Sequence, residues 1–147
     1  MMKKLFLMLL LSFTATPFFS QSVNADAITG IWISNLEKGH VEITRDGDKY
    51  NGKIVWLKNP TYPDGTAKID KNNPDKSKQS QPLIGLNVLK DLTFVKDHWE
   101  SGSIYDPESG KTYSCRATLK DNKLELRGYI GVSQIGRTQT WVRLDAK

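Results

Sequence analysis

Gly30-Ile31-Trp32 opens the first strand-like run of this chain, and Trp141-Val142-Arg143 closes the last one. Between the two runs lie segments of β type separated by turn residues, and none of them has the period of a long helix. A sheet whose last strand meets its first has no open edge, and an aromatic ring with a cation at the meeting point favours such closure. The sequence therefore predicts an all-β fold, an antiparallel up-and-down barrel of about eight strands that encloses a cavity.

Alternating apolar and polar residues place these strands along the chain. We expect them at residues 30–34, 40–46, 50–58, 92–95, 99–105, 111–119, 124–130 and 137–144, joined mostly by hairpin-sized turns. Residues 83–89 are expected to form a short turn of helix or a plug, and Gly52 is expected to mark a bulge or a sharp bend. In residues 59–82 polar residues dominate and Ile69 is nearly the only apolar side chain, which predicts a long loop of the kind that forms a lid or rim.

Residues 1–25 have the features of a secretory signal peptide. Lys3 and Lys4 supply its positive end, residues 5–13 are apolar apart from one Ser, and Val23-Asn24-Ala25 fits a small-residue cleavage site. We expect cleavage after Ala25, which leaves residues 26–147 as one domain of a periplasmic or secreted protein. The apolar run is much shorter than the ~20 residues of a membrane span, so no transmembrane anchor is expected.

Composition narrows the classes of partner. The formal net charge of +5 falls to +3 when Lys3 and Lys4 leave with the leader, and the remaining cations do not cluster, so no nucleic-acid partner is expected. The single cysteine, Cys115, cannot form an internal disulfide. It shares the apolar face of its strand with Tyr113 and Ala117, which predicts a small buried side chain rather than a reactive thiol.

Three motifs resemble cofactor or metal sites but lack decisive residues. Residues 131–138 differ by one residue from a phosphate-binding loop, with Arg137 in place of the Lys, and a strand pattern follows where a helix is required. Residues 70–75 offer oxygen ligands but lack the central Gly and distal Glu of a calcium loop, so Asx turns explain them. His40, His98 and one Cys do not complete a zinc set. We therefore expect no metal and no cofactor.

The aromatic side chains on the strands are the strongest candidates for a ligand-binding wall. Alternate strand residues should point into the barrel, and the candidates are Trp56, Tyr105, Tyr113 and Trp141. Ordinary core packing is the alternative, since a barrel of this size is either filled or holds one small ligand. On the last strand the inward face is left open. If Arg137, Gln139 and Trp141 point inward, they give the cavity a polar end suited to a carboxylate or head group. If they point outward, Trp141 needs a covering loop or a partner subunit.

Several motifs resemble those of one exported bacterial family. In order they are Gly30-x-Trp32, Gly52-Lys53-Ile54-Val55-Trp56-Leu57, Asp70-x-x-Asn73-Pro74-Asp75, Gly102-x-Ile104-Tyr105-Asp106-Pro107, Gly110-Lys111-x-Tyr113-x-Cys115, Arg127-Gly128-Tyr129-Ile130-Gly131 and Gly136-Arg137-Thr138-Gln139-Thr140-Trp141-x-Arg143. Together they resemble the family called domain of unknown function 2147, over essentially the whole chain after the leader. The resemblance implies a lipocalin-like barrel of an exported protein with no established activity. Its wider lipocalin pattern implies that Trp32 packs near Arg143 and closes the barrel.

Three functions are compatible with these features. The first is a carrier or sensor of a small amphiphilic or hydrophobic molecule, with the strand aromatics as walls and Arg137 as the partner of an anionic group. The second is a filled barrel that binds a protein partner through residues 59–82 or its outer face. The third is an enzyme, which would need a carboxylate or His in the cavity beside Arg116 or Arg137. No residues form a clear catalytic set, because His98 lies beside Asp97 and Glu100 in a turn, where solvated charge is ordinary.

Overall fold

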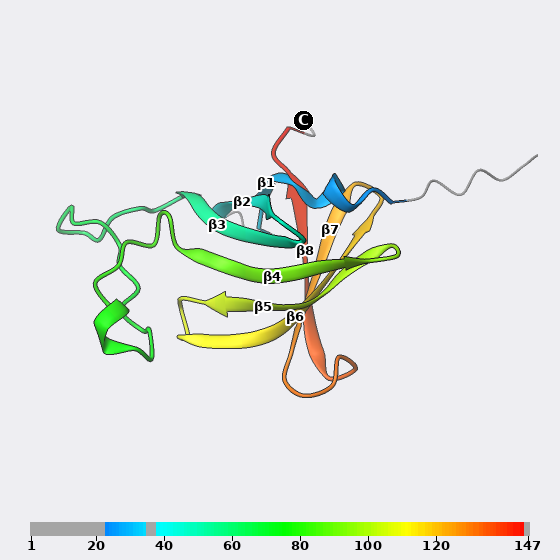
Figure 1. Ribbon diagram of the computed structural model, residues 1–147. Coiled ribbons are helices and arrows are strands. Elements are labelled where there is room, and N and C mark those ends of the chain that lie inside the picture. The colour runs from blue at the N-terminus through cyan, green and yellow to red at the C-terminus, as the bar shows by residue number, and fades with distance from the viewer. Residues whose placement is uncertain (1–22, 35–37, 146–147) are drawn as a thin grey trace, which may run out of the picture.

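The computed structural model describes residues 23–34 and 38–145, and its strands form one closed antiparallel barrel (Figure 1). Each strand pairs with the next in sequence, and the last pairs with the first. The strands are β1 (Gly30–Ile33), β2 (Gly39–Asp46), β3 (Lys49–Leu57), β4 (Asn87–Val95), β5 (His98–Asp106), β6 (Lys111–Lys120), β7 (Lys123–Tyr129) and β8 (Gly136–Arg143). The predicted all-β, up-and-down barrel of eight strands is therefore confirmed.

The charged and apolar parts of the expected leader, residues 1–22, lie outside the described residues. Within the described part of the chain, none of the helical segments is long and apolar enough to cross a membrane. The two helical segments there are the single turns η1 (Ala25–Ile28) and η2 (Lys76–Lys78).

Alternation along the strands produces the interior. Val41 and Ile43 of β2 are buried, whereas the residues beside them are more exposed. Cys115 and Ala117 are likewise the buried residues of β6. Successive side chains of a strand point to opposite faces, so a period of two is enough to build an inner wall. Tight hairpins join neighbouring strands, as at Asp121-Asn122, where both residues take the positive φ that a two-residue turn requires.

One strand boundary differs from the prediction by five residues, and the others differ by at most one. β4 begins at Asn87, so the end of the segment expected to be a helical turn or plug is strand. The adjacent residues Val88 and Leu89 are both buried, which hides the period of two from sequence reasoning. The β3–β4 register shifts on both sides of Gly52. A Cβ at Gly52 would lie 3.1 Å from Leu89, so the bulge expected there brings the two backbones close.

One end of the barrel is closed by the segment before β1. Ile28 of η1 is fully buried, in one cluster with core residues that include Trp99 and Leu92. The Trp99 indole N–H donates to the carbonyl of Ala25 at 3.1 Å, and the Tyr50 hydroxyl donates to Asp26 at 2.7 Å. These bonds satisfy polar groups that would be costly to bury alone.

The seam between β1 and β8 is fastened by two side chains. Trp32 pairs with Arg143 across the seam, and the guanidinium lies 4.2 Å from the centre of the Trp32 ring. The Arg143 guanidinium also donates to the carbonyls of Ala27 and Thr29 at 2.6 and 2.8 Å. Gly30 has a φ of +121°, and a Cβ there would lie 2.7 Å from the guanidinium. Only glycine fits this approach without strain.

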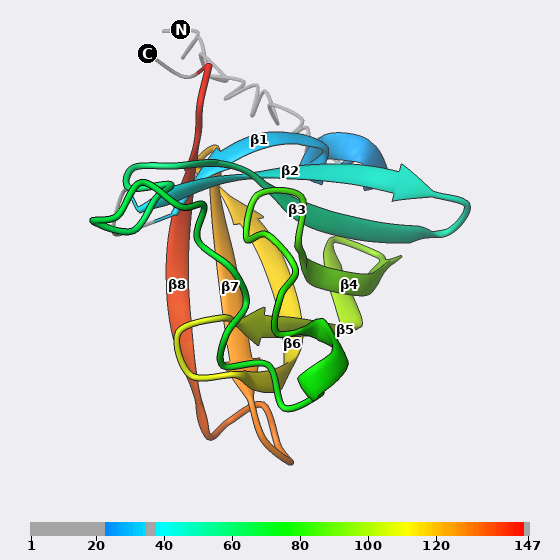
Figure 2. The same ribbon diagram turned by 90° about the vertical axis from the view of Figure 1, so that its left-hand side faces the viewer.

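The opposite end of the barrel carries the long connections. Figure 2 looks onto this end and shows the β3–β4 loop passing in front of the strands. Two isolated bridges, Thr61 with Ala67 and Ile69 with Pro82, give this loop internal order. The Asn72 amide donates to the carbonyls of Pro107 and Glu108 in the β5–β6 turn. The polar loop expected at residues 59–82 is thus folded back against the barrel.

His98 at the start of β5 is held between two carboxylates. Its ring nitrogens lie 2.8 Å from Asp97 and 3.0 Å from Glu100. The hydrogen bonds to Asp97 and then Glu100 raise the pKa of His98 above its ordinary value of 6.5. The protonated form is therefore favoured in the folded protein.

We expect this clamp to make stability depend on pH. The contribution of His98 is fully present below the unfolded pKa of about 6.5 and is lost as the pH rises through the raised folded pKa. The free energy of unfolding should fall by at most about 1 kcal/mol, because the two ion pairs of His98 lie near the surface. Urea unfolding between pH 6 and pH 9 measures this fall. The fall in the free energy of unfolding should be absent in His98→Gln. An equal fall in that variant would show that His98 is not the group responsible.

Candidate functional site

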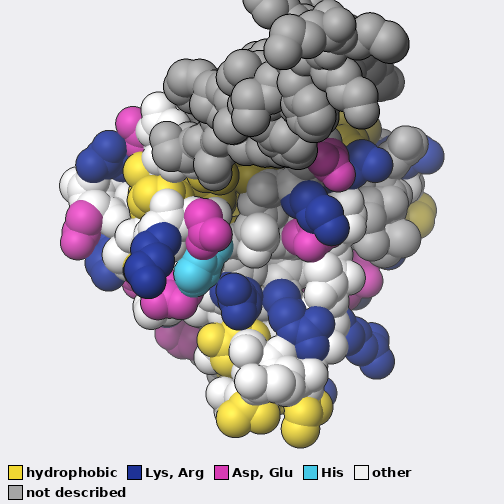
Figure 3. Space-filling view, turned by 90° about the vertical axis from the view of Figure 1, so that its right-hand side faces the viewer, with side chains coloured by type: hydrophobic (Ala, Val, Ile, Leu, Met, Phe, Trp, Pro, Cys, Tyr) yellow, Lys and Arg dark blue, Asp and Glu magenta, His cyan; other side chains and the backbone are white. Residues whose placement is uncertain are grey.

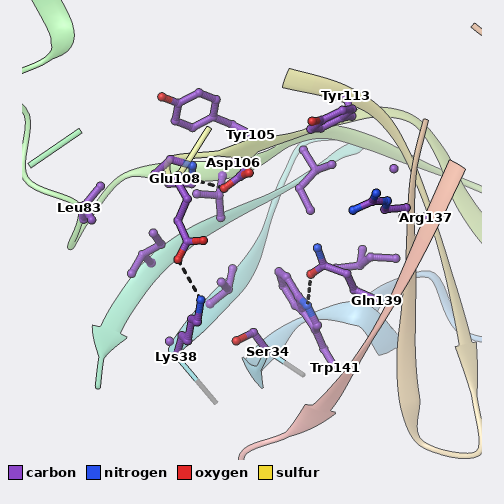
Figure 4. A pocket seen from close by; sticks show the side chains of 18 of the residues that line it. Ser34, Lys38, Leu83, Tyr105, Asp106, Glu108, Tyr113, Arg137, Gln139 and Trp141 are labelled. Atoms are coloured by element: carbon purple, nitrogen blue, oxygen red, sulfur yellow. Dashed lines mark hydrogen bonds and ion pairs between the residues drawn. The ribbon is translucent and has the colours of Figure 1, made fainter. Parts of the chain in front are cut away.

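A cavity of about 1030 Å³ lies inside the barrel and opens at the end with the long loops (Figure 4). Its interior wall is apolar and comes from strands on all sides of the barrel. The wall residues include Val41, Ile54, Val88, Ile104, Leu126 and Trp141. Its mouth is formed by the loops, with Lys38, Lys58, Lys68, Asp106 and Glu108 among the lining residues. The space is therefore apolar inside and charged at the entrance.

The inward face of β8 carries Arg137, Gln139 and Trp141, which settles the choice that the sequence left open. Figure 4 shows the three side chains standing on this strand toward the pocket. Trp141 is only 3% exposed, and its indole N–H donates to the Gln139 side-chain carbonyl at 3.2 Å. Val142, on the other face, is 41% exposed. Trp141 thus needs no partner subunit to cover it.

Arg137 is the cation of β8 that lies in the cavity lining. Its side chain is exposed, and among the described residues no side-chain hydrogen bond or ion pair engages its guanidinium. A different cation, Lys38, forms an ion pair of 3.1 Å with Glu108 across the mouth (Figure 4). The guanidinium of Arg137 is therefore free to meet an anionic group, whereas the ammonium of Lys38 is already paired.

Tyr105 and Tyr113 line the wall from the neighbouring strands β5 and β6. The Tyr105 hydroxyl donates to Asp70 at 2.7 Å, and the Asn73 amide donates to the same carboxylate at 2.7 Å. Asp70 has no exposed surface, although it lies in the long loop. Burial, followed by this bond to Asp70, raises the pKa of Tyr105 to about 12. Tyr105 thus lies in the cavity lining near the mouth, and its hydroxyl bonds the buried carboxylate of the loop.

The Tyr105–Asp70 bond should hold the long loop closed against β5. In Tyr105→Phe the carboxylate loses a donor while it remains buried, which is costly for a charged group. We expect limited proteolysis within residues 59–82 to accelerate severalfold while the barrel stays folded by circular dichroism. Tyr129→Phe is the control, because no hydrogen bond of its hydroxyl is present among the described residues. Equal proteolysis rates in wild type and Tyr105→Phe would show that the bond does not hold the loop.

The structure does not bring Trp56 into the cavity. Its side chain is 43% exposed and stacks on His40, with ring centres 4.4 Å apart. The β2–β3 register shifts here, because Val41 pairs with Ile54 whereas His40 pairs with Trp56. Val55 is the extra residue of this bulge, so Ile54 points inward while Trp56 turns to the outer surface. The prediction of a shared face for Ile54 and Trp56 is corrected on this ground.

Several residues of the site were not identified from the sequence. Leu126 is a wall residue that the alternation of β7 could have assigned, whereas Val88 lies where two adjacent buried residues break the period of two. The Lys38–Glu108 pair and the Tyr105–Asp70 bond join residues 70 and 35 positions apart, and no local signal reveals them.

The described residues hold no cluster of metal ligands, since they contain no group of three or more His, Cys, Asp or Glu side chains placed to hold a metal ion. The carboxylates at the mouth have structural partners, because Asp106 accepts from Ser109 and from the Glu108 backbone, and Glu108 pairs with Lys38. Burial raises the pKa of the Cys115 thiol to about 12, so it stays protonated.

An up-and-down barrel of eight strands, closed at one end by a helical turn and open at the other into an apolar-walled cavity, defines a lipocalin-like protein. The chain belongs to the family described as uncharacterized proteins conserved in bacteria, DUF2147, whose model matches residues 30–143. The resemblance seen in the sequence is therefore confirmed.

One solved structure is similar to this chain: protein HP1028 from the human pathogen Helicobacter pylori, which is described as belonging to the lipocalin family. The two are 28% identical, with a TM-score of 0.68 over 80% of this chain and 83% of the other. A search of curated proteins found no match.

Proposed function

We propose that this protein binds one small amphiphilic molecule inside the barrel, as a carrier or a sensor. The observation that carries the proposal is the open cavity of about 1030 Å³ with apolar walls. This volume is just above the range of about 300–1,000 Å³ that is typical of sites for small organic ligands. A ligand-sized space favours this function over a filled barrel that acts only through its surface.

The polarity of the cavity supports an amphiphile over a purely apolar ligand. An apolar chain would pack against Ile54, Val88 and Leu126 in the interior, and burial of each methylene is worth about 0.8 kcal/mol. A polar head would lie nearer the mouth, where Arg137 and Gln139 offer donors. A guanidinium binds a carboxylate or phosphate through paired hydrogen bonds, so we propose an anionic head group.

Mass spectrometry of the native protein, purified from its host without detergent, tests this function. We expect a species heavier than the chain by the mass of one small molecule, which organic extraction then releases for identification. A variant with Trp in place of both Ile104 and Leu126 narrows the cavity and should carry less of that molecule. Outer-face Val142→Trp is its control. The proposal fails if only the bare chain is found and the protein also takes up no added amphiphile.

Export to the periplasm or the medium is part of the same proposal. Cleavage after Ala25 would remove the carbonyl that accepts from Trp99, but it would keep Asp26 and its bond to Tyr50. Asp26 also pairs with Arg45 at 3.1 Å, so the new first residue would still be fastened to the barrel. N-terminal sequencing of the protein recovered outside the cytoplasm should begin at Asp26. A protein that keeps residues 1–25 and remains in the cytoplasm would contradict export.

A further inference from the structure

The loop between β7 and β8 exposes three large aliphatic side chains at one tip. Ile130 is 74% exposed, Val132 56% and Ile135 75%. The tip projects beyond the barrel in Figure 1 and forms the group of hydrophobic side chains at the bottom of Figure 3. Single exposed aliphatic residues are common, but three on one short loop form an apolar patch of the kind that marks an interaction site.

Arg127 holds this tip in shape. Its guanidinium donates to the carbonyl of Ser133, to the carbonyl of Gln134 at 2.9 Å and to the Thr138 hydroxyl at 3.0 Å. A backbone bond from Ile135 to the carbonyl of Val132, 3.1 Å long, closes the turn. The aliphatic side chains are therefore presented by a braced loop, so little ordering is required before they can be buried.

The chain segment that carries the tip is positively charged. The sequence from Arg127 to Leu144 contains no Asp or Glu, and Arg127 and Arg137 flank the loop at its two ends. In Figure 3 a row of Lys and Arg side chains lies directly above the apolar tip. An apolar tip below a row of cations matches the layering of an anionic bilayer, in which charged head groups cover an acyl interior.

We propose that the β7–β8 tip docks on an anionic phospholipid bilayer, with Ile130, Val132 and Ile135 entering the acyl boundary. A protein partner fits less well, because a stable protein interface buries about 1,200–2,000 Å², more than three side chains on a projecting loop supply. Ile130 and Ile135 also line the cavity, so docking would bring its mouth to the membrane surface. Docking does not require that the cavity be loaded.

A fluorescent label at the tip tests the proposal directly. Cys115 is fully buried, so Val132→Cys introduces a thiol that can be labelled selectively with an environment-sensitive dye. We expect a blue shift and stronger emission with vesicles of phosphatidylglycerol and phosphatidylcholine, and a weaker response at high salt or with phosphatidylcholine alone. The same dye on Ile84→Cys is the matched control, because Ile84 is 48% exposed but lies on the β3–β4 loop. An equal response at both positions would overturn the proposal.

Vesicle flotation gives the strength of docking. Val132→Asp should lower the partition coefficient of the protein roughly tenfold or more, since it removes a buried aliphatic group and adds a repelled charge. The control variant Ile84→Asp, made separately, should keep a partition coefficient near that of the wild-type protein. The proposal is overturned if the wild-type protein does not float with anionic vesicles. A concentration-dependent dimer that Val132→Asp abolishes, without vesicle binding, would overturn it in favour of a protein interface.

The two proposals can fail separately. Val132 does not line the cavity, so Val132→Asp should bind a free amphiphile as tightly as wild type in the absence of vesicles. Loss of flotation with retained amphiphile binding is the expected result. If the protein floats with vesicles but binds no amphiphile, the proposed ligand binding is contradicted and the proposed docking still stands.

Discussion

Trp32→Ala is expected to lower the free energy of unfolding by about 3–5 kcal/mol, the range for removing a buried large aromatic side chain. Trp32 is fully buried, donates to the carbonyl of Ile28 at 2.8 Å and lies against the Arg143 guanidinium. Its loss leaves a cavity at the seam where the barrel closes, and it removes one face of the site that holds Arg143. Urea unfolding followed by circular dichroism measures the change.

Trp56→Ala is the matched control for this prediction. The same side chain is removed, but Trp56 is 43% exposed on the outer surface of β3. We expect a loss of no more than about 1 kcal/mol there, above the ~0.5 kcal/mol of ordinary surface substitutions because the stack on His40 is also lost. Equal losses in the two variants would show that the β1–β8 seam is not where the barrel is fastened.

Arg137→Gln is expected to weaken binding of an anionic amphiphile about tenfold, because a hydrogen bond to a charged group is worth about 1.5–3 kcal/mol and this one is partly solvated. Glutamine keeps a donor and much of the length but loses the charge and the paired geometry. Isothermal titration calorimetry with a fatty acid measures this change in affinity. For the matching fatty alcohol, the affinity should be almost the same in wild type and Arg137→Gln.

Arg116→Gln provides the control for charge. Arg116 lies between Cys115 and Ala117, which are both buried inside, so its side chain is on the outer face of β6 and does not line the cavity. The affinity for the fatty acid should stay within about twofold of wild type, since solvent and salt screen a charge on the outer face of the barrel. If both variants weaken binding equally, net charge rather than Arg137 attracts the head group.

The fold could be predicted from the sequence because its signals are local. The period of two in β2, β6 and β7 assigns inner and outer residues without knowledge of the partner strands. Gly30-x-Trp32 and Trp141-x-Arg143 then pair the ends of the chain. β4 was placed less well, because Val88 and Leu89 are both buried and break the period.

The site could be predicted only in part, because bulges and long-range contacts decide it. A single extra residue in β3, Val55, turns Trp56 away from the cavity, and alternation carried past that point assigns it wrongly. The inward face of β8 was undetermined, since both of its faces carry plausible core residues. Asp70 reaches Tyr105 only after the long loop folds back on the barrel, and no period in the sequence encodes that contact.

Tryptophan fluorescence during titration with a series of fatty acids tests most directly whether the cavity receives a ligand. Of the four tryptophans, Trp141 is the one that lines the cavity. We expect a saturable change in emission with one molecule bound per chain, and we expect Trp141→Phe to lose that change while calorimetry still detects binding. Emission that stays constant across the whole series, with no heat of binding, would contradict a ligand-binding barrel.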